Sequence, residues 1–288
     1  MEYFLAVAET RSFTRAAERL HVVQSGVSAT IKALERELGV KLFVRGPGGA
    51  ALTAAGEELR PRALVTIDAA RAAKAAVTGA RETVTVGILT SINVIDLSAV
   101  LVRLYALRPG VSVQLRSAAA GTAGLERQLR DGELDIAFLV FPHEPPPDLR
   151  ARLVVSVPLV LVVPAGHPLA GAQAVPLSEL AGLSFVDCPR GYGNRTVVDN
   201  AFSAAGIERT VALEVADIGT LAANVRNGLG VGFLSRSIID EMGDSGLVTV
   251  RITDSDLLWR LYVATSAARA PSAAAQTLLS LIEEASGD

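Results

Sequence analysis

The feature that most constrains this fold is a pair of short helical patterns, within residues 12–38, that meet at a tight turn. The apolar residues of both patterns recur at helical spacing: Phe13, Ala16, Ala17 and Leu20, then Val27, Ile31, Leu34 and Leu38. Only residues 21–23 separate the two patterns, a length that is typical of a helix-turn-helix. Helices this short cannot bury both faces alone. We therefore expect a third helix against them, for which residues 3–8 supply apolar side chains.

The second predicted helix also has a polar face. This face carries Gln24, Ser25, Ser28, Ala29 and Lys32. Gln, Ser and Lys side chains form hydrogen bonds with base edges and phosphates, so the face suits a DNA groove. The spacing alone is equally compatible with a helical hairpin whose polar face is solvated.

A short hairpin is predicted directly after these helices. Residues 42–44 form an apolar run that ends at Arg45, a Gly/Pro turn occupies residues 46–49, and an apolar pair follows at residues 51–52. Thr53 then suits the cap of the next helix. This order predicts a winged helix-turn-helix over residues 1–53.

The sequence of this region resembles that of the LysR-type transcriptional regulators. The matching pieces are SFTRAAERLHV, the turn from Gln24 to Ser28, LERELGVKLFVR and LTAAGE, in that order. The resemblance implies DNA contacts by Gln24, Ser25, Ser28 and Lys32, and a contact of Arg45 with phosphate or the minor groove. Three departures remove family features, and we expect them to weaken non-specific DNA binding: Val23 stands in place of a Ser cap, Ala29 in place of a common Arg, and Gly48 and Ala51 in place of basic residues.

The totals limit the class of protein. A length of 288 residues suggests about two domains, and 50% hydrophobic residues suffice for a large core. We expect no membrane span and no signal peptide, hence a cytoplasmic protein. The single cysteine, Cys188, excludes an internal disulfide and a Cys/His metal framework, and we expect it to be buried and inert. No metal or cofactor is predicted.

The net charge of −3 is unevenly distributed. Residues 1–81 carry 12 Lys and Arg against 8 Asp and Glu, a balance of +4. The remainder carries 15 against 22, a balance of −7. A mildly basic head on an acidic body fits a DNA-binding domain joined to a ligand-binding domain.

Residues 54–80 read as one long, Ala-rich linker helix. Pro61 lies inside it and should bend it, and Gly79 should close it. Its broken apolar stripe consists of Leu59, Ala63, Ile67, Ala70 and Val77. A solitary connecting helix is the alternative, but the resemblance implies that this helix pairs with a second copy, giving a homodimer or homotetramer.

Residues 81–288 alternate between strand and helix patterns, which predicts parallel sheets covered by helices. We expect two α/β lobes of the kind seen in periplasmic binding proteins, about 81–157 with 263–288, and about 158–262. The phrases PLVLVVPAGHPLA and GLGVGFL also resemble the LysR-type effector domain. The predicted fold class is therefore α+β and multidomain, with a winged helix-turn-helix, a linker helix and a two-lobed effector domain.

In open α/β sheets, ligands bind beyond the carboxyl ends of strands and at helix N-termini. The candidate effector residues at such places are Thr90, Ser91, Gly121, Thr122, Asn194, Arg195 and Asp217. Hydroxyls and N–H groups suit an anionic effector, with Arg195 as its counter-ion. The alternative for each residue is a helix cap or a loop hydrogen bond.

Together these patterns predict a transcriptional regulator that binds promoter DNA and responds to a small molecule, with RNA polymerase as a candidate partner. Two other classes stay open: a solute-binding protein and an α/β enzyme. The enzyme class lacks support, because the glycine run at residues 228–232 leads into a strand rather than a helix. His21, His143 and His167 likewise stand in the head or in Pro-flanked turns, without a nucleophile.

Overall fold

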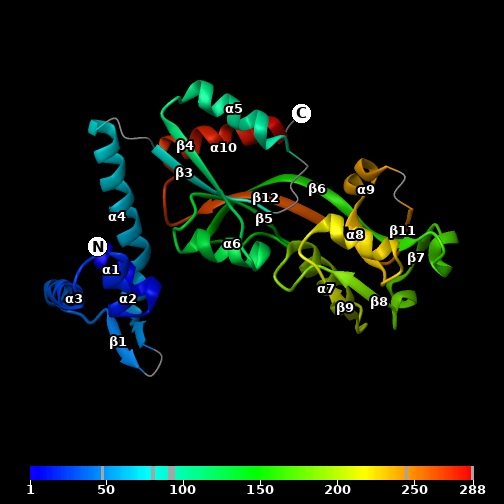
Figure 1. Cartoon of the computed structure of the whole chain (residues 1–288), viewed down its shortest axis with the longest axis horizontal. Helices are drawn as coiled ribbons and strands as arrows, with labels where there is room; N and C mark the ends of the chain where they lie inside the picture. Colours follow the sequence, from blue (N-terminus) through cyan, green and yellow to red (C-terminus); the bar gives the residue numbers. More distant parts are fainter. Residues whose placement is uncertain (47–48, 79–81, 90–94, 244–245, 287–288) are drawn as a thin grey trace. The chain divides into compact units, whose positions relative to one another are not determined.

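A computed structural model of the chain describes residues 1–46, 49–78, 82–89, 95–243 and 246–286 (Figure 1). It divides into two compact units. The first consists of Met1–Glu82 with Ala268–Ser272, and the second of Thr83–Ala267 with Ala273–Asp288. Each unit is described by itself below.

The first unit begins with three helices around one small core. Buried apolar side chains from each helix meet there, and Phe43 of the following strand lies 5.4 Å from Phe4 and 5.7 Å from Phe13, measured between ring centroids. The predicted helix-turn-helix and its third helix are therefore confirmed. The elements are α1 (Glu2–Thr10), α2 (Phe13–Arg19), α3 (Gln24–Leu38), β1 (Phe43–Gly46), β2 (Gly49–Leu52) and α4 (Ala54–Thr78).

The apolar stripe of α3 is one residue shorter than predicted. Val27 and Ile31 are buried and Leu34 is half-buried, but Leu38 is 44% exposed. Leu38 is the last residue of α3, and Gly39 follows it with a φ of 72°, so the chain turns away there. The side chain that is buried on this turn is Glu35, because backbone N–H groups of the wing bind it.

The helix α4 begins after Thr53, whose hydroxyl accepts a hydrogen bond from Gly56 N–H, as predicted for its cap. The helix continues through Pro61. Ala63 is buried, and Leu59 and Ile67 pack against the core of the head. Three of the five residues in the stripe that was expected to pair with a second copy therefore pack within the chain. The predicted end at Gly79 lies outside the described residues.

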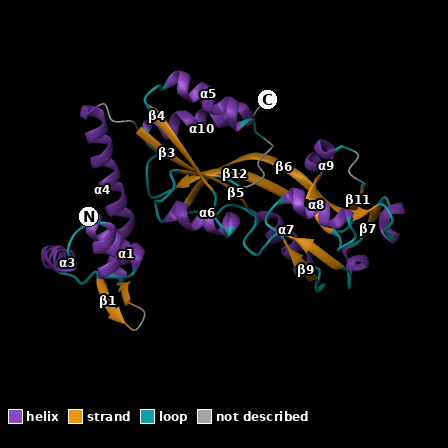
Figure 2. Ribbon diagram, viewed as in Figure 1, coloured by secondary structure: helices purple, strands orange, loops and turns teal. Residues whose placement is uncertain are grey.

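The second unit is a mixed sheet covered by helices (Figure 2). Its strand order is β4-β3-β5-β12-β6-β11-β7, with β10 also on β6, and β8 and β9 form a separate parallel pair. The strands are β3 (Glu82–Gly87), β4 (Val111–Arg116), β5 (Ile136–Val140), β6 (Leu149–Pro164), β7 (Ala174–Val175), β8 (Ser184–Asp187), β9 (Thr210–Glu214), β10 (Gly232–Ser235), β11 (Leu247–Ile252) and β12 (Leu258–Ser266).

The prediction of parallel sheets is only partly right. β3 pairs with β5 in parallel, but β12 returns antiparallel to both β5 and β6. β6 is long enough to serve both lobes, because Leu149–Pro158 pair with β12 whereas Leu159–Pro164 pair with β10 and β11. Two long antiparallel strands thus join the lobes.

The helices of this unit are divided between the lobes (Figure 1). α5 (Leu97–Leu107), α6 (Gly121–Arg130) and α10 (Ala273–Ser286) belong to the first lobe. α7 (Gly193–Ala204), α8 (Ile218–Arg226) and α9 (Arg236–Met242) belong to the second. No sequence pattern indicated α9, β7, or the short 3-10 turns Pro168–Gly171 and Leu177–Leu180, since each is too brief for an apolar period.

Candidate functional site

The N-terminal half of α3 presents the predicted DNA-facing residues. Gln24 and Ser25 are exposed in the first turn, Lys32 is exposed two turns later, and Ser28 is half-buried. The Gln24 side-chain amide donates a hydrogen bond to Ser28 Oγ over 3.0 Å. This bond orients the amide, which leaves its oxygen and second N–H available for a base edge. Val23 precedes α3 without a side-chain cap bond, as its apolar side chain requires.

The wing is the antiparallel pair of β1 and β2, as predicted. Arg45 lies in β1 opposite Ala50, but its side chain is outside the described part of the chain. Its contact with DNA therefore remains a prediction.

Glu35 connects the recognition helix to the wing. Its carboxylate accepts hydrogen bonds from Leu42 N–H at 2.9 Å, Phe43 N–H at 3.3 Å and Lys41 Nζ at 2.9 Å. Burial alone would raise the pKa of Glu35, but these three donors outweigh it and lower that pKa. Sequence reasoning missed this residue, because a glutamate on a helix normally reads as solvated.

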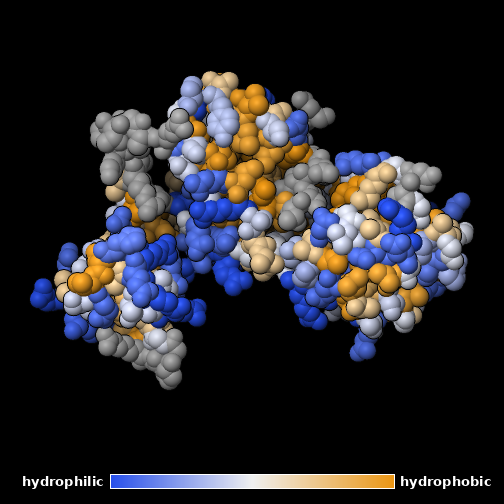
Figure 3. Space-filling model, in the orientation of Figure 1, coloured by the Kyte–Doolittle hydropathy of each residue, from blue (hydrophilic) through white to orange (hydrophobic). Residues whose placement is uncertain are grey.

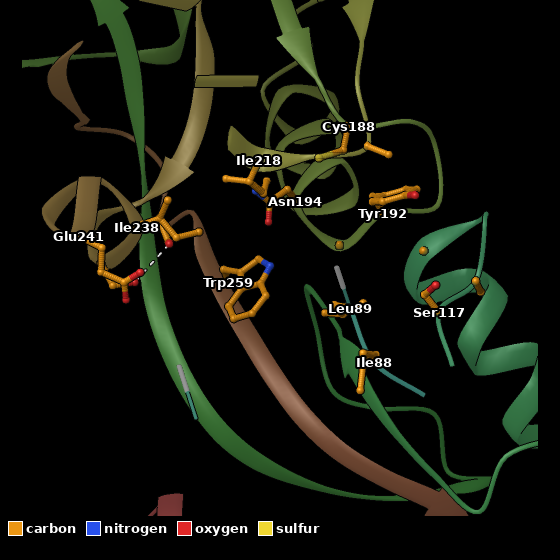
Figure 4. Close-up of a pocket in the computed structure, with 16 residues that line it drawn as sticks. Ile88, Leu89, Ser117, Cys188, Tyr192, Asn194, Ile218, Ile238, Glu241 and Trp259 are labelled. Carbon is orange, nitrogen blue, oxygen red and sulfur yellow. Dashed lines mark hydrogen bonds between the residues drawn. The ribbon is translucent and has the colours of Figure 1, made fainter. Parts of the chain in front are cut away.

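A pocket lies between the two lobes of the second unit (Figure 4). Its volume is about 60 Å³, room for several water molecules or a small organic ligand. The first lobe contributes the carboxyl ends of β3 and β4 and the start of α6, and the second contributes the starts of α7, α8 and α9. The lining residues are Ile88, Leu89, Ser117, Ala118, Gly121, Cys188, Tyr192, Gly193, Asn194, Ala216, Ile218, Ser235, Ser237, Ile238, Glu241 and Trp259.

One side of the pocket is closed by direct contact between the lobes. Ala123 N–H at the start of α6 donates to the Gly191 carbonyl over 3.1 Å. Gly121 has a φ of 54°, and a Cβ there would lie 2.8 Å from the Tyr192 ring. Both glycines let the backbones approach, so the loop before α7 rests on the start of α6.

Of the seven predicted effector residues, two line this pocket. Gly121 and Asn194 belong to the lining, at the starts of α6 and α7. Thr122 is buried beside Gly121, and its hydroxyl has no hydrogen-bond partner among the described residues. Thr90 and Ser91 lie outside the described residues, so their role stays a prediction.

The prediction for Arg195 was wrong. Its guanidinium donates to Asp199 at 2.7 Å, to Glu214 at 3.0 Å and to the Cys188 carbonyl at 3.2 Å. The side chain is 7% exposed and does not line the pocket. Arg195 therefore fixes the loop behind the pocket wall and is not available as the counter-ion of an anionic effector.

The prediction for Asp217 fails for a similar reason. Its carboxylate accepts from Thr220 N–H at 2.7 Å and from the Thr220 hydroxyl at 2.8 Å, which caps α8. These hydrogen bonds lower its pKa. Its neighbours Ala216 and Ile218 line the pocket instead. The helix-cap alternative holds at this position.

Fourteen of the sixteen lining residues were not among the predicted effector residues, and five of these fourteen lie on α9, its cap and β12. Ser235, Ser237, Ile238 and Glu241 come from α9 or its cap, and Trp259 comes from the long strand β12 (Figure 4). The strand-end rule could have found Ser235, because it ends β10. Trp259 gave no sequence signal of a site, because a tryptophan in a strand usually reads as core.

Cys188 is also among the lining residues of the pocket, although it is buried. Burial raises its pKa to about 12, and the neighbouring carboxylates of Asp187 and Asp217 add to the rise. The thiol therefore stays protonated at physiological pH and is a poor nucleophile. Its predicted inertness agrees with this environment.

A buried ion pair lies behind the same wall. Arg209 Nη1 is 2.5 Å from Asp187, and both side chains are almost fully buried. The Arg209 guanidinium also lies over the rings of Phe185 and Phe202, at 5.0 and 5.5 Å. Burial raises the pKa of Asp187 against the opposing effect of Arg209. The pair holds β8 and β9 together beneath the pocket.

Two family descriptions match the chain over nearly its whole length. Residues 1–57 match the bacterial regulatory helix-turn-helix proteins of the lysR family, and residues 78–287 match the LysR substrate binding domain. No helix in the described ranges is both long and apolar enough to cross a membrane.

Curated relatives and solved structures agree with these matches. A probable hydrogen peroxide-inducible genes activator of Mycobacterium avium is 34% identical, covering 82% of this chain and 76% of the relative. The Hca operon transcriptional activator HcaR of Escherichia coli is 34% identical, covering 80% and 79%. The structure is similar to that of a mutant of Corynebacterium glutamicum OxyR in its H2O2-bound form, with 26% identity, a TM-score of 0.58 and coverage of 99% and 92%. Full-length BenM gives 25% identity and a TM-score of 0.58, with coverage of 98% and 94%.

Proposed function

Because this chain belongs to the family of LysR-type transcriptional regulators, we propose that α3 and the wing bind promoter DNA and that a small molecule between the lobes controls this binding. The proposal assigns base contacts to Gln24, Ser25 and Ser28, and phosphate contacts to Lys32 and Arg45. The observation that carries it is the polar start of α3, where Gln24 is exposed and held by Ser28.

Gln24 is the residue in this set that is best suited to reading a base. A glutamine amide pairs with adenine through one acceptor and one donor, and the hydrogen bond to Ser28 fixes the amide plane before DNA arrives. Lys32 lies further along the same exposed surface and adds a charge without sequence preference. In this arrangement, the start of α3 contacts the bases and the following turns contact the phosphates.

The effector acts, in this proposal, by biasing the distance between the lobes. The contact between Gly191 and the start of α6 is made only when the lobes approach on that side. A ligand that touches both lobes stabilises one separation over another, and it has no effect unless its affinity for the two differs. Thr90 and Ser91 follow the lining residue Leu89 in sequence and are assigned to the same ligand.

We further propose that the working species is a homodimer or homotetramer in the cytoplasm, with RNA polymerase as its partner at the promoter. α5 supports self-association, because Val102 is 69% exposed, Leu107 64% and Tyr105 42%. Apolar surface gathers over α5 in Figure 3. Val65 on α4 is also exposed, at 39%. Such patches mark contacts between protein chains.

The two alternative classes find less support. A solute-binding protein would have no use for a helix-turn-helix with a polar recognition face. The curated relatives are transcriptional regulators, so the chain is a regulator rather than an enzyme.

A binding assay with the full-length protein tests the proposal. Wild type and Gln24→Ala are titrated onto the DNA upstream of the protein's own gene and onto a scrambled fragment of equal length. We expect the variant to lose about tenfold to a hundredfold in affinity for the upstream DNA and little for the scrambled DNA. Glu37→Ala, which alters an exposed residue near the far end of α3, serves as the matched control. Equal affinity of wild type for both fragments would contradict the proposal.

A further inference from the structure

Among the residues that the structure describes, the lining of the pocket between the lobes carries no positive side chain. Glu241 is the described lining residue with a full formal charge, and that charge is negative. Arg195 is bound to Asp199 and Glu214 behind the wall. An anionic ligand would therefore find no side-chain counter-ion in this described lining.

Helix N-termini can hold an anion without a basic side chain, but most of those around this pocket are already used. The start of α8 is capped by the carboxylate of Asp217, which cancels its partial positive charge. At the start of α6, Ala123 N–H is bound to the Gly191 carbonyl. α9 has only seven residues. That leaves the start of α7, together with Thr122 N–H at the start of α6, for which no hydrogen-bond partner is found among the described residues. A single helix N-terminus improves anion binding by only about twofold to thirtyfold.

The surroundings of Cys188 also disfavour a negative charge at this wall of the pocket. Cys188 lines the pocket, and burial together with Asp187 and Asp217 raises the pKa of its thiol to about 12. A negative charge at this position is therefore disfavoured both by the loss of water and by two nearby carboxylates. A ligand carboxylate placed against Cys188 would meet the same penalties.

The remaining lining suits an uncharged ligand. Ile88, Leu89, Ile218, Ile238 and Trp259 provide apolar contacts from both lobes (Figure 4). Hydrogen-bonding groups without charge stand among them, on Ser117, Asn194, Ser235 and Ser237. This combination of apolar walls with a few neutral donors and acceptors fixes the orientation of a ligand without needing a charge.

We infer that the effector of this regulator carries no negative charge: it is a small neutral molecule with an apolar, ring-sized body and one or two hydroxyl or amide groups. The inference rests on the proposed function, because it names the ligand class of the same pocket. It replaces the expectation of an anionic effector, which rested on hydroxyls and N–H groups at helix starts with Arg195 as the counter-ion. The charge of Glu241 disfavours a carboxylate in the pocket, and Trp259 offers a surface for the apolar body.

Trp259 is the single tryptophan of the chain, so its fluorescence reports on this pocket alone. The full-length protein is titrated with three probes that share one ring: cyclohexanecarboxamide, cyclohexylmethanol and cyclohexanecarboxylate. We expect the amide or the alcohol to bind at least about tenfold more tightly than the carboxylate. In Glu241→Gln, the affinity for cyclohexanecarboxylate should rise several-fold, whereas the affinity for cyclohexanecarboxamide should change little. Glu284→Gln removes an equal charge on α10, outside the lining, and should leave both unchanged.

The outcomes separate this inference from the proposed function. Carboxylate binding as tight as amide binding overturns the inference and leaves effector control intact. A neutral preference without any effect of the probe on promoter affinity supports the ligand class and counts against effector control. If none of the probes changes the Trp259 signal at millimolar concentration, the inferred ligand class is wrong, and the proposed binding of promoter DNA is unaffected.

Discussion

Glu35 shows how one side chain can join two elements of the DNA-binding head. Its carboxylate satisfies two backbone N–H groups at the start of the wing and also pairs with Lys41. Without it, the N–H groups of Leu42 and Phe43 would be buried and unpaired. The recognition helix and the wing would then lose their fixed relation, although neither would lose its own hydrogen bonds.

We predict that Glu35→Ala destabilises the head by about 2–3 kcal/mol, because an unsatisfied buried N–H costs roughly 1–3 kcal/mol. Glu35→Gln keeps an acceptor and should lose less. In Glu35→Ala, denaturation followed by far-UV circular dichroism should show unfolding of the head at a lower denaturant concentration than in the wild type. The transition in Trp259 fluorescence, which reports on the other unit, should not shift. Coincident and unchanged transitions in Glu35→Ala would contradict the assigned role.

The lowered pKa of Glu35 also gives a pH dependence. A carboxyl group with a lower pKa in the folded state stabilises that state when it is ionised. This contribution is complete above the unfolded value of about 4.3, and it is lost as the pH falls through the lower folded pKa. Below about pH 4, the free energy of unfolding of the head should therefore fall more steeply in the wild type than in Glu35→Gln.

Residue identity predicted which side chains are exposed better than it predicted the partners of buried side chains. Gln24 and Lys32 are exposed as expected, since a polar face on a short helix has few alternatives. Arg195 and Asp217 were assigned to the ligand because charged residues at helix starts suit it. In the structure they bind Asp199, Glu214 and Thr220. The sequence alone does not determine whether such a residue binds a ligand or a neighbouring side chain.

At the scale of elements, amphipathic periods and strand patterns predicted the positions of most helices and strands. They did not predict the shortest elements or the direction of the strand that runs antiparallel to its neighbours. α9 has seven residues, too few to show a period, yet it contributes three lining residues of the pocket. The direction of β12 was missed because sequence patterns do not record whether a strand runs parallel or antiparallel to its neighbours.

The exposed face of α5 leads to a prediction about assembly. Val102→Lys combined with Leu107→Lys should lower the mass of the full-length protein measured by sedimentation equilibrium, because two buried contacts between copies would become charged. Val44→Lys changes an apolar residue on the wing that is also exposed, at 52%, and should leave the mass unchanged. An unchanged mass in the double variant would show that α5 is not an interface.

At the scale of the whole molecule, the uneven distribution of charge along the sequence predicts the salt dependence of DNA binding. The balance of +4 over residues 1–81 is modest, and the exposed start of α3 has few cations. Affinity falls with salt in proportion to the number of phosphates contacted. We expect a shallow dependence for each head, so that specificity rests on Gln24, Ser28 and the spacing of heads in the oligomer. A slope equivalent to about ten phosphate contacts per head would contradict this.

The central claim is that this chain is a DNA-binding regulator, and a footprint of the purified full-length protein tests it most directly. The DNA would span the region upstream of its own gene and of any divergently transcribed neighbour, with Gln24→Ala measured in parallel. We predict a long protected region in two blocks, as expected of an oligomer with several heads, and its loss in the variant. Absence of protection at low salt, or equal protection by Gln24→Ala, would contradict the reading surface assigned to α3.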